Sequence, residues 1–285
     1  MIGLIASWPS LLAGTAIAAA SGLVGWFAVL RAQVFAADAM SHFAFTGAVA
    51  AVASGLNPLF GLFALTVGCA LILAGLGGRS RVDDVTIGVA ITWVLGLGVL
   101  ALSVIDHHGA GGAGATAAIA LFGDITAIDT QHAQIAVGIG GLVIAVVIVI
   151  ARPLMFATID GVVARTRGVP VVALGLVFLL ALAGVAAEAT QAVGALLLLG
   201  LVAAPAGAAH RLTARPYLGM AISVVIGMAS VWIGLAISTQ VPQIPASSAI
   251  VGIAAACFAA ARVPGRLVAH VQRTRPLREH TTDVG

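Results

Sequence analysis

Residues 131–151 read QHAQIAVGIGGLVIAVVIVIA, a run that contains no Asp, Glu, Lys or Arg. An α-helix needs about 20 predominantly apolar residues to cross the hydrocarbon core of a bilayer, and this run is long enough. It lacks the alternation of apolar and polar residues that marks a strand of a membrane barrel. Because every backbone polar group in lipid must be satisfied within the protein, the run predicts a transmembrane helix.

The whole chain shares this character. Of its 285 residues, 61% are hydrophobic and 8% are charged, whereas about 25% are charged in an ordinary soluble domain. The mean hydropathy is +1.16. A soluble protein cannot bury so much apolar surface, so we expect an all-α, polytopic transmembrane helical bundle. Cys69 and Cys257 both lie in apolar runs and are expected to be small core residues rather than a disulfide or a metal site.

Charged residues and turns rich in Pro and Gly divide the chain into similar apolar runs. Their lengths predict eight or nine spans, since one short or re-entrant segment alters the count. The first run is long enough to remain as a span, so no cleavable signal peptide is expected. Residues 1–262 would form the membrane domain and residues 263–285 a basic cytoplasmic tail. The nine candidate spans are residues 8–30, 33–54, 58–77, 85–105, 131–151, 169–187, 190–210, 217–238 and 246–262.

The arginines predict the orientation in the membrane. The chain has no lysine, and with nine alternating spans all 13 arginines fall on the same side. Positive residues gather in cytoplasmic loops, so this side is expected to be cytoplasmic. The amino terminus would then be outside and the carboxyl terminus inside.

The opposite side is acidic and carries three of the seven histidines. Its longest segment, from Asp106 to Ala118, is rich in glycine and is expected to be flexible. Residues 120–129, ALFGDITAID, are too few to span and suggest a partial or re-entrant helix. The ionisable residues expected on this side are Asp106, His107, His108, Asp124, Asp129, His132 and Glu188.

Two ionisable residues lie inside the second candidate span, where residues 37–45 read ADAMSHFAF. Asp38 lies about 10 Å deeper than Arg31, and an aspartate at the centre of a span costs about 2.5–3.5 kcal/mol. It should therefore face the bundle interior or a water-filled path. His42, four residues on, shares its helix face, and such a pair suits zinc, manganese or iron. The alternative is an internal ion pair between Asp38 and Arg31.

The run from Val29 to Ala50, VLRAQVFAADAMSHFAFTGAVA, resembles the second-helix motif of the ABC-3 family. These proteins are permease subunits of bacterial ABC importers for zinc, manganese and iron. The resemblance covers nearly the whole chain. The further matching stretches are RSRVDDVTIGVAITWVLGLGVL (79–100), LFGDITAI (121–128), IDGVVARTRGV (159–169) and AVGALLLLGLVAAPAGAAHRL (192–212). The chain departs from the family's pattern at Asp124, where an asparagine is common, and at Glu188, where no acid is expected.

The resemblance implies a permease fold of the type II ABC importers and places the metal path at Asp38 and His42. It implies a homodimer in a bacterial cell membrane, with two ATP-binding cassette subunits and an extracytoplasmic metal-binding protein as partners. No nucleic acid partner and no permanently bound cofactor are expected, since the divalent metal is the cargo. Asp106, His107, His108 and Glu188 are candidate outer metal contacts, and Glu188 is expected to end a helix at the outer interface.

Residues 152–168 form an amphipathic stretch between two spans, and residues 159–169 are here called the coupling segment. The resemblance implies that it docks into the ATPase, and its alternative role is a helix lying on the membrane surface. The residues expected to matter are Ile159, Asp160, Ala164, Arg165, Arg167, Gly168 and Val169. The chain has no Gly-x-x-x-x-Gly-Lys-Ser/Thr loop, so it is not expected to be an enzyme, and ATP hydrolysis would occur in a separate subunit.

Three other functions remain open. A proton-coupled secondary transporter would use Asp38 as its proton carrier and would need no ATPase. An intramembrane enzyme is disfavoured, because the sequence contains neither His-Glu-x-x-His nor Gly-x-Ser-x-Gly. An ABC permease for an iron chelate or cobalamin would not need protein ligands for a bare ion, which Asp38 and His42 supply. The sequence does not select one metal, because ligand type leaves zinc, manganese and iron open.

Overall fold

The computed structural model describes residues 8–77, 83–107, 113–241 and 243–262. Within these residues the chain is helical and contains no strand, which confirms the all-α prediction. The predicted tail, residues 263–285, lies outside them. The helices are α1 Trp8–Leu30, α2 Val34–Ala53, α3 Pro58–Gly77, α4 Asp84–His107, α5 Ala113–Phe122, η2 Ile125–Ala127, α6 Thr130–Ile159, α7 Gly161–Thr166, α8 Val171–Val193, α9 Leu198–Leu212, α10 Pro216–Gln240 and α11 Ala246–Ala260.

Seven of the described helices are long and apolar enough to cross a membrane, namely α1, α2, α3, α4, α6, α8 and α10. The shorter apolar helices α9 and α11 have 15 residues each. The predicted count of eight or nine spans therefore stays a prediction.

One predicted boundary is wrong. A span was expected over residues 190–210, but α8 continues to Val193 and α9 begins at Leu198. The break falls at Gly194, whose φ of +89° is a conformation that side-chain-bearing residues rarely adopt. The glycine-rich stretch from Asp106 to Ala118, which was expected to be flexible, begins in the last turn of α4 and ends in α5, and its residues 108–112 lie outside the described residues.

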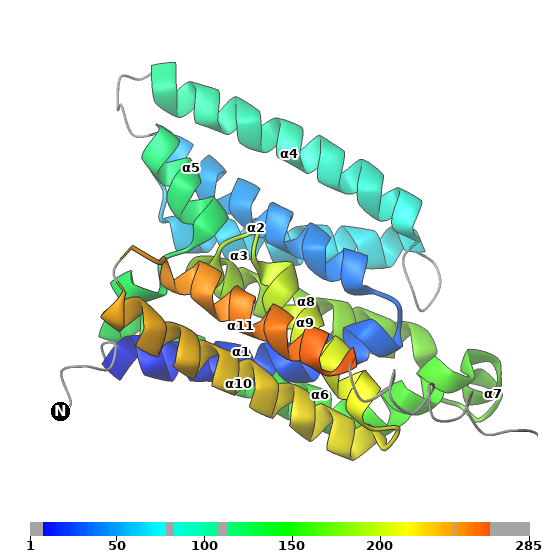
Figure 1. Cartoon of the computed structure of the whole chain (residues 1–285). Coiled ribbons are helices and arrows are strands. Elements are labelled where there is room, and N and C mark those ends of the chain that lie inside the picture. Colours follow the sequence, from blue (N-terminus) through cyan, green and yellow to red (C-terminus); the bar gives the residue numbers. More distant parts are fainter. Residues whose placement is uncertain (1–7, 78–82, 108–112, 242, 263–285) are drawn as a thin grey trace, which may run out of the picture.

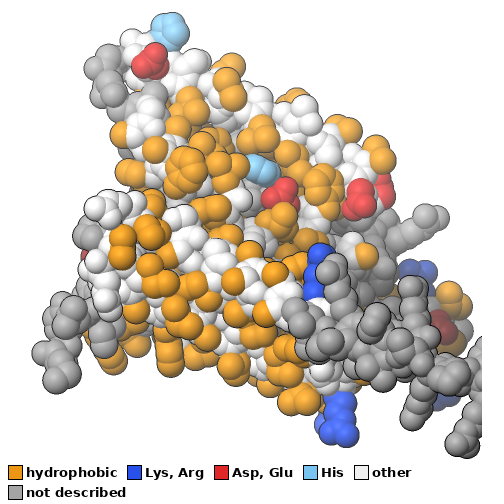
Figure 2. Space-filling view, viewed as in Figure 1, with side chains coloured by type: hydrophobic (Ala, Val, Ile, Leu, Met, Phe, Trp, Pro, Cys, Tyr) orange, Lys and Arg blue, Asp and Glu red, His pale blue; other side chains and the backbone are white. Residues whose placement is uncertain are grey.

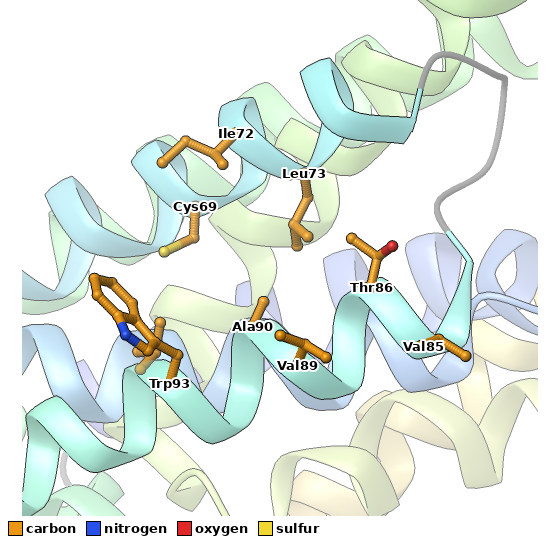
Figure 3. A pocket seen from close by; sticks show the side chains of 9 residues that line it. Cys69, Ile72, Leu73, Val85, Thr86, Val89, Ala90 and Trp93 are labelled. Atoms are coloured by element: carbon orange, nitrogen blue, oxygen red, sulfur yellow. The ribbon is translucent and has the colours of Figure 1, made fainter.

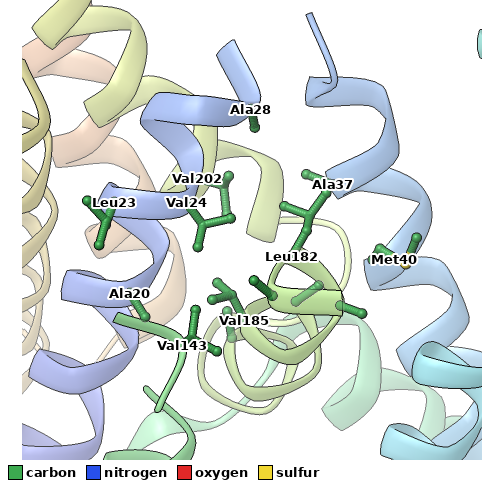
Figure 4. Packing of buried hydrophobic residues seen from close by; sticks show 14 of the residues in the cluster. Ala20, Leu23, Val24, Ala28, Ala37, Met40, Val143, Leu182, Val185 and Val202 are labelled. Atoms are coloured by element: carbon green, nitrogen blue, oxygen red, sulfur yellow. The ribbon is translucent and has the colours of Figure 1, made fainter. Parts of the chain in front are cut away.

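The helices form two groups joined by α8 (Figure 1). In one group α1 packs against α6, α9 and α10, and α11 covers α9 and α10. In the other group α2 packs against α3 and α4, with α4 along one edge of the molecule. Helix α8 contacts α1 and α6 on one side and α2 and α3 on the other, so the core runs through it. Figure 4 shows Leu182 and Val185 of α8 between Val24 of α1 and Met40 of α2.

The charged residues separate the bundle into two ends, which we call the arginine end and the acidic end. Arginine side chains gather at one end of the face shown in Figure 2, while hydrophobic side chains cover its flanks. An apolar flank is what contact with lipid tails requires. The described residues of the arginine end are Arg31, Arg152, Arg165, Arg167, Arg211, Arg215 and Arg262, and those of the acidic end are Asp106, His107, Asp124, Asp129 and His132.

An apolar groove of about 420 Å³ separates α3 from α4 (Figure 3). Cys69 and Leu73 line it from α3, and Val89 and Trp93 line it from α4. The hydroxyl of Thr86, which also lines the groove, donates a hydrogen bond to Asp83 Oδ1 (2.8 Å). Such a lining offers no set of oxygen and nitrogen ligands for a bare divalent cation, so the metal path is not expected here.

Candidate metal site on helix α2

Helix α2 starts from a tight elbow at the arginine end. Arg31 N–H donates to Phe27 O (2.8 Å) and Gln33 N–H donates to Ala28 O (2.8 Å), so the turn closes against the end of α1. Ala32 adopts a left-handed conformation with φ +52°. The elbow leads directly into α2, so Asp38 and His42 lie within its first three turns. Helix α2 as a whole packs mainly against α3, α4 and α8.

Asp38 and His42 face one another along α2, as their spacing predicts. His42 Nε2 lies 3.8 Å from Asp38 Oδ2, and the two side chains are 17% and 27% exposed respectively. This distance is too long for a good hydrogen bond. A transition metal lies about 2.0–2.2 Å from nitrogen and oxygen ligands, so one ion can bridge two such atoms up to about 4.3 Å apart. The pair can therefore hold one divalent ion between its two side chains.

The other nitrogen of the imidazole is also available. His42 Nδ1 is buried and has no hydrogen-bond partner among the described residues. A buried polar atom without a partner costs free energy and calls for an explanation. A ligand that enters with its own water molecules would provide one.

The alternative ion pair between Asp38 and Arg31 does not match the geometry. Within the described residues, the ion-pair partner of Asp38 is His42. The Arg31 guanidinium turns instead toward Gln33 Oε1 (2.8 Å from Nε) and Thr158 Oγ1 (3.1 Å from Nη1). Asp38 therefore pairs with His42 and not with Arg31.

One copy of the chain offers two candidate ligands at this position. Among the described residues, no group of three or more His, Cys, Asp or Glu side chains gathers closely enough to hold an ion. Asp38 and His42 are two ligands, while stable coordination of a transition metal takes four to six. An ion held there would need further ligands from elsewhere.

The candidate outer contacts do not converge on one point. Asp106 and His107 are exposed at the last turn of α4, where a His107 ring nitrogen donates to Ser103 O (Nδ1–O 2.7 Å). His108 lies outside the described residues. Glu188 was expected to end a helix at the interface, and this is wrong because α8 continues to Val193. Its side chain is buried, with 4% exposed, and Oε1 has no hydrogen-bond partner among the described residues.

A pocket of about 590 Å³ opens at the acidic end and gathers polar residues that the sequence did not single out. Asn57 and Gln191 line it together with Asp124 and His132. These residues come from distant parts of the chain, so no local pattern could have identified them. The nearby Asp129 caps α6 by accepting the His132 N–H (2.8 Å). This hydrogen bond from the backbone, together with a hydrogen bond from the His132 ring, lowers the pKa of Asp129 below its ordinary value.

The coupling segment folds into a short helix at the arginine end. The Asp160 carboxylate caps α7 by accepting the N–H groups of Val162 and Val163 (3.0 and 2.9 Å). Ala164 is fully buried and packs in the core, which anchors α7 to the bundle. Ile159, which the structure assigns to α6, and Val162 are 76% and 75% exposed.

The far end of the coupling segment is closed by a turn. Gly168 has φ +79°, and Val169 N–H donates to Ala164 O (3.0 Å). Arg165 lies in the last turn of α7 and Arg167 caps it. Two cations and exposed apolar side chains therefore share one small surface, which is suited to a protein partner.

Comparisons with known proteins agree with this architecture. A family model described as the ABC 3 transport family matches residues 6–263. The manganese transport system membrane protein MntC of Halalkalibacterium halodurans is 30% identical over 241 residues, which cover 84% of this chain and 80% of that protein. The manganese import system permease protein ScaB of Streptococcus parasanguinis is 27% identical over 250 residues, 87% of each chain. The solved structure of PsaBC from Streptococcus pneumoniae in complex with Fab contains a chain of similar fold, with a TM-score of 0.78, 24% sequence identity and coverage of 92% of this chain and 94% of that one.

Proposed function

The chain belongs to the ABC 3 transport family, and from that premise we propose that it imports manganese(II), with Asp38 and His42 as the transient ligands of the ion. The coarser function is that of a multi-pass membrane permease of an ATP-driven importer of divalent transition-metal ions. The observation that carries the proposal is the pair of side chains on α2, which lie 3.8 Å apart and leave His42 Nδ1 without a partner among the described residues.

Manganese is favoured by two arguments. MntC and ScaB, the relatives named above, are manganese permeases by their names. Chemistry allows the same cargo, because carboxylate and water ligands suit manganese in octahedral geometry. If two copies of α2 flank a two-fold axis, two carboxylates and two imidazoles leave two positions for water. A shell of four protein ligands without water would instead suit zinc.

Release of the ion would be helped by a coordination shell that protein ligands fill only in part. A structural metal site is closed by protein ligands and holds its ion permanently. A transport site must let the ion leave, so a shell completed in part by water is an advantage. The partial exposure of Asp38 and His42 gives water access to both side chains.

We place the arginine end in the cytoplasm, because positive residues gather on the inner side. The coupling segment would then dock the separate ATPase through Ile159, Val162 and the cations at Arg165 and Arg167. The acidic end would receive the ion from an external metal-binding protein, with Asp106 and His107 attracting cations. Residues 1–262 form the membrane domain in this proposal, close to the range that the family model matches.

The test is metal accumulation by cells that depend on this importer. Cells expressing the chain with its ATPase should accumulate manganese, measured by elemental analysis, and lose that uptake with either Asp38→Ala or His42→Ala. Repeating the manganese measurement with zinc added in excess tests whether the importer selects manganese over zinc. If both variants accumulate manganese at the rate of the parent chain, the assignment of the ligands is overturned.

A further inference from the structure

We propose that Arg31 is a positioning residue that ties helix α2 to the coupling segment, so that a movement of α7 reaches the metal ligands on α2. This inference rests on the proposed function, because it takes α7 as the surface that the ATPase moves. It adds a specific connection between the surface where the ATPase docks and the metal ligands.

Arg31 is a charged side chain in an unusual place. It lies at the elbow between α1 and α2 and is 1% exposed. A guanidinium has five N–H donors in a fixed planar fork, and each bond that it makes fixes its orientation. Its Nε donates to Gln33 Oε1 at 2.8 Å, and its Nη1 donates to Thr158 Oγ1 at 3.1 Å. Its carbon Cζ lies 5.3 Å from the ring centroid of Phe178, so the group also contacts α8.

The bond to Thr158 reaches the start of the coupling segment. Thr158 lies in the last turn of α6, and Asp160, two residues later, is the cap of α7. The Thr158 hydroxyl also donates to Leu154 O (2.6 Å), which fixes its position on α6. A displacement of α7 therefore acts on Asp160, and through the last turn of α6 on the atom that Arg31 contacts.

On the other side, Arg31 and the start of α2 form one unit. The elbow has only the residues Arg31, Ala32 and Gln33 between α1 and α2. Gln33 O accepts the N–H groups of Ala36 and Ala37 (3.1 and 3.3 Å), which begins the first turn of α2. Because the Gln33 side chain is bonded to the Arg31 guanidinium as well, a shift of Arg31 carries that turn with it. Asp38 follows within the same stretch of helix.

A purely structural role for Arg31 makes a different forecast. A buried arginine that only stabilises the fold would, when replaced, lower the amount and the melting temperature of the protein. Each folded molecule would still import the same number of ions for each ATP hydrolysed. The ratio of transported manganese to hydrolysed ATP therefore separates the two roles.

The experiment uses the full importer, the chain with its ATPase and external metal-binding protein, in proteoliposomes. Thr158→Val removes the hydroxyl that Arg31 contacts and keeps the shape of the side chain, while Thr158→Ser restores the hydroxyl. We expect Thr158→Val to assemble with the ATPase and to transport about fivefold fewer manganese ions per ATP, the effect of losing one hydrogen bond from a two-state equilibrium. Thr158→Ser should restore the ratio of the parent chain. Arg31→Met should reproduce the loss, and the double variant should be no worse than either single one.

The matched control is Arg211→Met. Arg211 also lies at the arginine end over an aromatic ring, 4.8 Å from the centroid of Phe258, but it is on α9 and makes no hydrogen bond or ion pair with α6 among the described residues. Its replacement should leave the ratio unchanged. The inference is overturned if Thr158→Val and Arg31→Met both transport with the ratio of the parent chain, or if Thr158→Ser is as impaired as Thr158→Val.

A double charge reversal separates this outcome from failure of the proposed function. Arg165→Glu combined with Arg167→Glu should uncouple ATP hydrolysis from transport in the reconstituted importer. If ATP hydrolysis and transport stay coupled in that variant, docking at α7 is wrong. If they are uncoupled while Thr158→Val keeps the ratio of the parent chain, the proposed function stands and only the role of Arg31 falls.

Discussion

A Cβ atom placed on Gly47 of α2 would lie 2.2 Å from the carbonyl oxygen of Gly61 on α3, and a Cβ on Gly61 would lie equally close to Gly47 O. The two backbones therefore touch where these helices cross. In a membrane, where apolar burial does not drive helices together, such close approach of small residues supplies much of the packing energy. This crossing fixes α2 in place one turn beyond His42.

The first prediction is that Gly47→Ala destabilises the chain. The added methyl group must push α2 away from α3, and overpacking of this kind typically costs about 1–3 kcal/mol. The measurement is the thermal unfolding temperature of the detergent-solubilised protein. Gly68→Ala, also in a helix of this pair, is the control because a Cβ there has no atom within 4 Å. Equal unfolding temperatures for the two variants would contradict the packing argument.

The second prediction concerns the metal ligands. Asp38→Ala and His42→Ala each remove a polar group from a span, so both should insert at normal levels. Each should lower manganese uptake at least about tenfold, because one ligand of an incomplete shell cannot hold the ion. The measurement is uptake at matched amounts of protein in the membrane.

Ser41→Ala provides the control for that experiment. Ser41 lies between the two ligands in sequence, is buried, and donates its hydroxyl to the backbone carbonyl of Asp38 (2.7 Å). Its loss changes the polarity of the same helix without removing a ligand. Uptake near that of the parent chain is expected, and a loss as large as that of His42→Ala would mean that the helix is simply intolerant of change.

The sequence predicted the helical class and the face that Asp38 and His42 share, because both follow from local periodicity and composition. It could not predict the partners of Arg31. Thr158 lies 127 positions away in the chain, and a contact of this kind depends on how α1 and α6 pack. The sequence allowed an ion pair between Arg31 and Asp38 because their spacing permits it, whereas the tight elbow turns the guanidinium the other way.

The boundary errors have a physical cause as well. Hydropathy does not register a backbone break inside an apolar run, so the end of α8 and the start of α9 were placed too early. The left-handed conformation of Gly194 and the close approach of Leu121 O, 2.2 Å from where its Cβ would stand, are properties of the folded chain. The predicted position of Glu188 was wrong for the same reason: a helix predicted to end at residue 187 would leave Glu188 at the surface, whereas α8 continues to Val193.

The third prediction concerns the coupling segment. Arg165→Glu combined with Arg167→Glu should uncouple ATP hydrolysis from transport, because reversed charges repel a surface that was matched to cations. The measurement is metal uptake and ATP hydrolysis by the reconstituted importer. Arg215→Glu, at the arginine end but on the N-cap of α10, should leave coupling intact. Full uptake by the permease without any ATPase would refute the importer assignment altogether.

The fourth prediction is that His107 and His108 are dispensable at saturating metal. His107 is exposed and its ring nitrogen is bonded to Ser103 O, within its own helix. His107→Ala combined with His108→Ala should change uptake only modestly, and chiefly at low manganese, where attraction of cations matters. A manganese titration of uptake measures this. Abolished transport at saturating manganese would make these histidines required ligands.

The last prediction is a pH dependence at the start of α6. The hydrogen bond from the His132 backbone N–H lowers the pKa of the Asp129 carboxyl below its ordinary value of 3.8, and the side chain is 61% exposed. A carboxyl whose pKa is lower in the folded than in the unfolded state adds stability above the unfolded value, and this contribution is lost as the pH falls through the folded value. Asp129→Ala should therefore lower the unfolding temperature at pH 7, and its difference from the parent chain should shrink as the pH falls below about 4. Asp129→Asn retains a cap but does not titrate. It should melt close to the parent chain at pH 7 and at or above it at pH 3. A gap between Asp129→Ala and the parent chain that stays constant from pH 7 to pH 3 would show that the charge of Asp129 contributes nothing to holding the first turn of α6.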